Sequence, residues 1–97
     1  MIVYVCIGNS DDKLRQFDWS LFVMEAKNLF SQVKKHGEWF SAPDARYQNA
    51  CWCIEIQPNE KEFIQKFLTA MCRSYEQDSI SWAEVPMTEF IGPIGSQ

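Results

Sequence analysis

Residues 2–12, IVYVCIGNSDD, determine how the rest of the chain can fold. The stretch from Ile2 to Ile7 is apolar and rich in β-branched side chains, which favours a short buried strand. Gly8 and the polar residues that follow it are typical of a turn. The segment therefore predicts a strand over residues 2–7 that later elements must cover.

Two later segments have the apolar spacing of amphipathic helices. The first spans residues 16–35, and Gly37 follows it at the position of a C-terminal capping glycine. The second begins after Pro58, with Asn59 as its N-cap and Glu62 as the capping-box partner. The expected core-facing residues are Trp19, Phe22, Val23, Ala26, Leu29, Phe30 and Val33 in the first helix, and Phe63, Ile64, Phe67, Leu68, Met71, Cys72 and Tyr75 in the second.

Short apolar segments predict further strands over residues 38–41, 50–56 and 79–85. The resulting order, β-α-β-β-α-β, is the ferredoxin-like split βαβ arrangement of the α+β class. Right-handed crossovers then give an antiparallel four-stranded sheet of order 4-1-3-2, with both helices on one face. We expect a single domain over residues 1–97 that ends in a flexible tail at 92–97.

The composition is that of a globular protein, with 46% hydrophobic and 23% charged residues. No segment is long and apolar enough to span a membrane, and none has the form of a signal peptide, so we expect a cytoplasmic protein that does not bind membranes. The net charge of −4 opposes attraction to phosphate backbones and argues against general coating of nucleic acids.

The cysteines and the single histidine give little support to catalysis. Cys51, Cys53 and Cys6 are a candidate soft-metal site, but their spacing is not that of zinc sites, and buried reduced thiols are the expectation. His36 lies in a basic stretch where it would complement the end of the first helix. The chain also lacks the phosphate-loop, dinucleotide and hydrolase motifs, so a non-catalytic role is expected.

The expected topology brings three polar segments, residues 8–15, 41–49 and 76–79, to one edge of the sheet. Aspartates in them are candidate ligands for Mg²⁺, the one cofactor considered, while Lys13 and Arg46 are candidate partners of an anion. These aspartates are Asp11, Asp12, Asp44 and Asp78. Asn, Ser and Asp are also favoured in turns and caps, so a purely structural role stays open for the first segment.

The sequence Arg46-Tyr47-Gln48-Asn49 combines a planar cation, an aromatic face and two amides within one hairpin connection. This combination suits a planar polar ligand such as a nucleobase, or a protein surface. The alternative is that Tyr47 packs on the core and Arg46 pairs with Asp44. The residues expected to bind a ligand are Asn9, Ser10, Asp11, Asp12, Lys13, Arg46, Tyr47, Gln48, Asn49 and Asp78.

The first strand is apolar on both of its faces. The faces carry Ile2, Tyr4 and Cys6 on one side, and Val3, Val5 and Ile7 on the other. Because the helices cover only one face of the sheet, the other face requires a homodimer, a bound partner or cover by residues 90–94. We favour the homodimer.

Four segments resemble small phage and bacterial proteins, actinobacterial ones among them, for which no function is established. They are GNSDDKL (8–14), HGEW (36–39), YQNACW (47–52) and QDSISWAE (77–84). The resemblance covers nearly the whole chain. Many phage proteins of this size block host defence, either by binding a defence protein or by sequestering a nucleotide signal, and the resemblance implies such a role by analogy.

The chain is also similar to the ferredoxin-like nucleases associated with CRISPR systems, which are dimers with an aspartate at the end of the first strand. Here that strand ends in Ile7-Gly8-Asn9, and no basic ridge for duplex DNA is present. We therefore expect a small binding protein that holds a nucleotide-like or other small anionic ligand. The alternatives are an inhibitor that binds a host protein through an acidic surface or apolar sheet face, and a Mg²⁺-dependent nuclease or phosphoryl-transfer enzyme.

Overall fold

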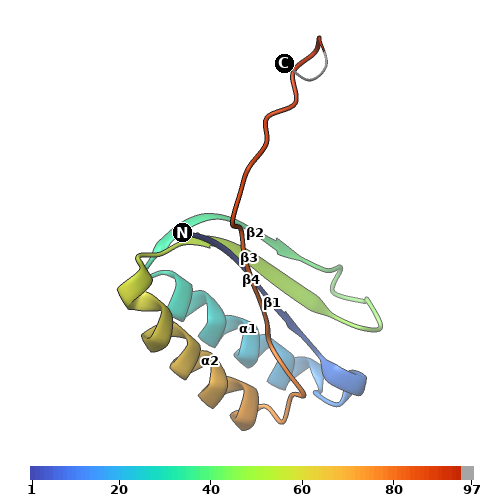
Figure 1. Ribbon diagram of the computed structural model, residues 1–97. Coiled ribbons are helices and arrows are strands. Elements are labelled where there is room, and N and C mark those ends of the chain that lie inside the picture. The colour runs from blue at the N-terminus through green and yellow to red at the C-terminus, as the bar shows by residue number, and fades with distance from the viewer. Residues whose placement is uncertain (95–97) are drawn as a thin grey trace.

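A computed structural model describes residues 1–94 and places both helices on one side of the sheet (Figure 1). The main elements are β1 (Ile2–Gly8), α1 (Gln16–Phe30), β2 (Lys34–Phe40), β3 (Asn49–Glu55), α2 (Lys61–Ser74) and β4 (Ser81–Glu84). Two short 3-10 turns, η1 (Ser10–Asp12) and η2 (Pro58–Glu60), precede the helices. The expected β-α-β-β-α-β order of the α+β ferredoxin-like class is confirmed.

The sheet has the order β2-β3-β1-β4, and every neighbouring pair is antiparallel. This is the predicted order 4-1-3-2 read from the opposite edge. β1 is central and pairs along its length with β3, from Ile2 opposite Glu55 to Gly8 opposite Asn49. The register fixes which residues share a face, because directly paired residues point to the same side of a sheet.

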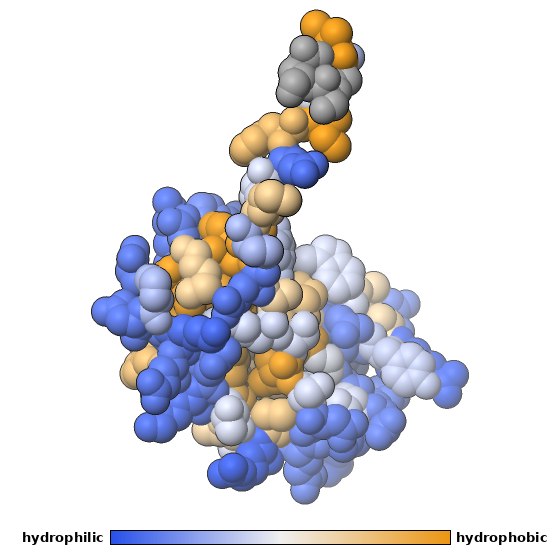
Figure 2. Space-filling view, viewed as in Figure 1, coloured by the Kyte–Doolittle hydropathy of each residue, from blue (hydrophilic) through white to orange (hydrophobic). Residues whose placement is uncertain are grey.

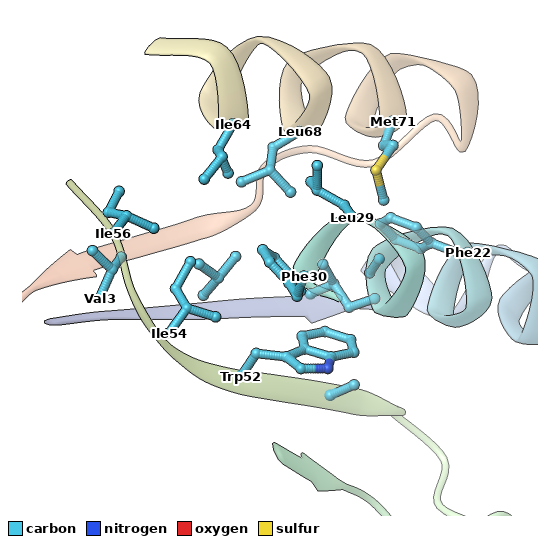
Figure 3. Packing of buried hydrophobic residues seen from close by; sticks show 14 of the residues in the cluster. Val3, Phe22, Leu29, Phe30, Trp52, Ile54, Ile56, Ile64, Leu68 and Met71 are labelled. Carbon is cyan, nitrogen blue, oxygen red and sulfur yellow. The ribbon is translucent and has the colours of Figure 1, made fainter. Parts of the chain in front are cut away.

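The core lies between the sheet and the two helices (Figure 3). Val3 and Val5 of β1 and Trp52 of β3 are fully buried there. The centres of the Phe30 ring of α1 and the Trp52 ring are 5.2 Å apart. The helices contribute Trp19, Phe22, Ala26, Leu29, Phe30, Ile64, Leu68 and Met71, as the apolar spacing predicted. Phe63 and Phe67 were also expected in this core, but about half of each side chain is exposed, and the two rings contact each other.

The first helix is five residues shorter than predicted, because it ends at Phe30 and the chain enters β2 at Lys34. Backbone pairing with the end of β3 takes residues that the periodicity alone assigns to the helix. The register shifts between Lys35 and Gly37, so His36 occupies a bulge in the strand. The predicted roles of Gly37 as a helix cap and His36 as a helix-end cation are therefore wrong. Gly37 has no left-handed φ, and the His36 ring contacts Glu55 instead.

The start of the second helix also differs from the prediction. The Gln57 backbone N–H donates to the Glu60 carboxylate at 2.7 Å, so the capping box lies two residues before the predicted pair of Asn59 and Glu62. Pro58 then starts the short η2 turn that leads into α2.

The chain beyond β4 extends away from the body, on the side of the sheet opposite the helices (Figure 1). We call residues 86–94 the arm. The predicted tail at 92–97 lies within the arm up to residue 94, and its last three residues lie outside the described part of the chain. No helix within residues 1–94 is long and apolar enough to cross a membrane.

Candidate functional site

The structure brings the three predicted polar segments together at one edge of the sheet, which we call the loop edge (residues 8–15, 41–49 and 76–79). The Asn9 backbone N–H donates to the Gln48 carbonyl at 3.0 Å, which joins the first segment to the second. The Ser10 N–H donates to the Gln77 side chain at 2.7 Å, which joins the first to the third. The segments thus form one surface.

Three buried amide side chains, one from each segment, hold this edge together. They are Asn9, Gln48 and Gln77, each less than 10% exposed. Asn9 bonds both the N–H and the carbonyl of Leu14 at 2.9 Å and so closes the turn after β1. Because an amide has donors and an acceptor, it can satisfy backbone groups of both kinds inside the protein. The Gln48 side chain likewise donates to the Pro43 carbonyl at 2.9 Å, so the predicted ligand residues Asn9 and Gln48 are both occupied by structural hydrogen bonds.

Gln77 is the member of this set that sequence reasoning missed. Its side-chain oxygen accepts from the Ser10 N–H, and its side-chain nitrogen donates to the Tyr75 carbonyl at 2.9 Å. A glutamine in a polar loop has no distinguishing pattern in the sequence. Only the approach of the first and third segments in space reveals its role.

The turn after β1 has an unusual backbone. Asp11 and Asp12 both adopt left-handed φ values, 54° and 52°, which aspartate tolerates better than most residues. A Cβ atom at Gly8 would lie 3.0 Å from the Asn49 side-chain oxygen, so glycine allows the hairpin to approach β1 closely. The turn thus leaves the exposed carboxylate of Asp11 at the edge of a hollow.

This hollow has a volume of about 450 Å³ and opens between the end of β1, the hairpin and the start of β4. Its lining includes Ser10, Asp11, Tyr47, Asn49, Ser79 and Ser81. Within residues 1–94, the side chains of Asp11, Ser79 and Ser81 make no hydrogen bond or ion pair. The hollow therefore offers free hydroxyl and carboxylate groups beside the exposed Tyr47 ring, and Asp11 is the one charged residue in its lining among the described residues.

The two predicted cations lie outside the hollow. Lys13 donates to the Glu76 carbonyl at 2.8 Å and lies 3.9 Å from the Asp78 carboxylate, so it ties the first segment to the third. The Arg46 guanidinium lies 5.3 Å from the centre of the Tyr47 ring, and 57% of Tyr47 is exposed. The alternative in which Tyr47 packs on the core and Arg46 pairs with Asp44 is thus not what the described chain shows.

The site has few groups suited to catalysis. Cys6 is the one thiol in the lining, and burial, then the facing Cys51 side chain, raises its pKa to about 12. Such a thiol is neutral near pH 7 and is a poor nucleophile. All four cysteines are free and partly exposed, so the expectation of buried thiols is wrong.

The aspartates do not converge on a common point. Among residues 1–94, no group of three or more His, Cys, Asp or Glu side chains is arranged to hold a metal ion. This geometry gives the Mg²⁺-dependent nuclease alternative no metal centre in the described part of the chain. It also leaves the three cysteines of the sheet without the ligand set of a soft-metal site.

The opposite end of the sheet, which we call the far edge, has a different character. The His36 ring lies 2.8 Å from the Glu55 carboxylate, and the Lys34 ammonium group lies 3.8 Å from it. The hydrogen bond with His36 is the main reason why the pKa of Glu55 is lowered. Lys61 lies 2.6 Å from the Glu84 carboxylate and lowers its pKa. These carboxylates are already paired.

Comparison with known proteins identifies no relative: the chain matches no protein-family model, no curated protein and no solved structure.

Proposed function

We propose that this protein is a small non-catalytic binding module that holds a nucleotide-like ligand in the hollow of the loop edge. One observation carries the proposal. Three segments far apart in the sequence form a hollow of about 450 Å³ lined by the exposed Tyr47 ring and by the Ser79 and Ser81 hydroxyls, which make no hydrogen bond within residues 1–94. Binding sites for small molecules combine a hollow of this size with a few convergent polar groups.

The lining favours the base part of such a ligand. The exposed ring of Tyr47 offers a face on which a planar base can stack, and the Ser79 and Ser81 hydroxyls can each donate and accept hydrogen bonds at its edge. A phosphate inside the hollow would meet the Asp11 carboxylate, which repels it. We therefore expect the phosphate to lie at the rim of the hollow. Arg46 is exposed there and can bind a phosphate through two N–H groups.

A biological role follows from the resemblance to phage proteins. Under this proposal the protein acts against host defence by sequestering a nucleotide signal, which requires binding and no turnover. The alternative, an inhibitor of a host protein, is supported by the exposed Tyr4 and Trp39 side chains on the uncovered sheet face.

Thermal-shift screening against nucleotides and cyclic nucleotides tests the proposal. We expect at least one of them to raise the melting temperature of the wild-type chain, because a ligand that binds only the folded state stabilises it. Tyr47→Ala and Arg46→Ala should each lose most of that shift.

Two variants serve as matched controls. Tyr47→Phe retains the stacking surface and should keep most of the shift, and Arg73→Ala removes an exposed arginine of α2 and should keep all of it. A screen in which no nucleotide changes the melting temperature contradicts the proposal. So does a shift that survives Tyr47→Ala.

A further inference from the structure

The face of the sheet that the helices leave uncovered, which we call the open face, is apolar at its centre. The register places Tyr4 beside Cys53, Cys6 beside Cys51, and Trp39 beside Cys51 on the other flank. Tyr4 is 48% exposed and Trp39 is 56% exposed. Large apolar side chains gathered on one exposed face indicate an interaction surface.

This face also has a shallow hollow and a neutral charge balance. Gly37 has no side chain, and the space beside it forms a hollow of about 200 Å³ between Tyr4 and Trp39. At the far end of the face, Glu55 is paired with His36 and Lys34. A second copy can therefore approach the face without bringing unpaired charges together.

The arm carries apolar side chains that its own domain does not cover. Met87 is 71% exposed, Phe90 is 95% exposed and Ile91 is 90% exposed. The Val85 N–H donates to the Ile2 carbonyl at 2.9 Å, so the arm starts at the sheet itself. It then leaves on the side of the open face, and its apolar residues project beyond the body (Figures 1 and 2).

The size of the two surfaces fits a dimer. A fully exposed aromatic side chain presents roughly 150–250 Å². Burying Tyr4, Trp39, Met87, Phe90 and Ile91 in both copies would then remove roughly 1,500 Å² from water, within the range of roughly 1,200–2,000 Å² for a stable interface. The nine residues of the arm extend to about 30 Å at about 3.3 Å per residue, which is enough to cross a four-stranded sheet.

We propose that two copies of this chain pair through their open faces and exchange arms, so that Phe90 and Ile91 of each copy lie against Tyr4 and Trp39 of the other. The occupant of the open face is thus a second copy, related by a two-fold axis, because each copy carries both the face and the arm. The interface adjoins the ligand site of the loop edge, because Cys6 belongs to the open face and also lines the hollow.

Measurement of molecular mass by light scattering, over a wide range of protein concentration, tests the arrangement. We expect the full chain to have twice the mass of the 11.4 kDa monomer. The double variant Phe90→Asp with Ile91→Asp should shift the chain to the monomer, as should Trp39→Asp. Phe90 and Ile91 make so little contact with the domain that their replacement leaves its circular dichroism unchanged.

The control is Phe63→Asp with Phe67→Asp. These aromatic side chains of α2 are 52% and 50% exposed, close to the 56% of Trp39, but they lie on the helix side of the sheet. This variant should remain a dimer. A monomeric wild-type chain overturns the proposal, and so does a dimer that survives both arm substitutions.

Discussion

The loop edge and the far edge lie at opposite ends of the same four strands, and they use polar groups in different ways. At the far edge, Glu55 and Glu84 are each paired with a basic side chain. At the loop edge, the buried amides are satisfied, while Asp11 and two serine hydroxyls face a hollow and have no partner within residues 1–94. From this difference we infer that the far edge serves stability, while the loop edge has the free polar groups that the proposed binding role requires. Substitutions at the two edges should therefore affect different properties.

The largest effect is expected in the core, which supports the strands that lead to both edges. Trp52 is fully buried against Phe30 and contacts Phe40, so Trp52→Ala removes the centre of the sheet packing. We expect it to lower the free energy of unfolding by about 3–5 kcal/mol, measured by urea denaturation. Ligand binding should be lost with it. Retention of normal stability would show that the core is not built around this residue.

An intermediate effect is expected from the buried amides of the loop edge. Asn9→Ala leaves the backbone N–H and carbonyl of Leu14 without their partner, which should cost about 1–3 kcal/mol in the free energy of unfolding. The matched control is Asn59→Ala, an exposed asparagine near the far edge whose side chain makes no hydrogen bond within residues 1–94. It should change stability by less than about 0.5 kcal/mol. Equal effects of the two substitutions would contradict the structural role of Asn9.

The smallest effect concerns the far edge and depends on pH. His36 lowers the pKa of Glu55, and Lys61 lowers that of Glu84, so both carboxylates are more acidic in the folded chain than in the unfolded chain. The unfolded state then binds protons first, and the stability that these pairs provide is lost as pH falls through the lowered pKa values. The pairs are exposed, so the effect is small.

Urea denaturation between pH 7 and pH 3 measures this effect. The double variant Glu55→Gln with Glu84→Gln should lose less stability on acidification than the wild type. Glu89→Gln, in the arm, should follow the wild-type curve. Binding of a nucleotide at neutral pH should be the same in all three chains, since the far edge does not form the hollow.

The sequence was sufficient to predict the topology because of particular residues. The apolar run of Ile2 to Ile7, the helical spacing from Trp19 to Phe30 and the turn signal at Gly8 each depend on local preferences. The meeting of the three loop segments followed from topology alone. It required no knowledge of any side-chain contact.

The features that the sequence did not predict depend on interactions between residues that are distant in the chain. The extension of β2 into Lys34 and the bulge at His36 result from pairing with β3, which no local pattern records. Apolar periodicity did not distinguish Phe63 and Phe67 from Leu68, because it shows which residues share a face and not how far the opposing sheet extends. The role of Gln77 is set by Ser10, which is distant in the sequence.

The position of a bound nucleotide on the protein decides whether the loop edge is a binding site. Backbone amide chemical shifts of the ¹⁵N-labelled chain should be measured during titration with the nucleotide that gives the largest thermal shift. We expect the amides of Glu55 and Glu84 to stay unchanged, while changes concentrate at Ser10, Asp11, Tyr47, Asn49, Ser79 and Ser81. Changes centred on the far edge or the open face, or no saturable change at all, would contradict the proposed binding site.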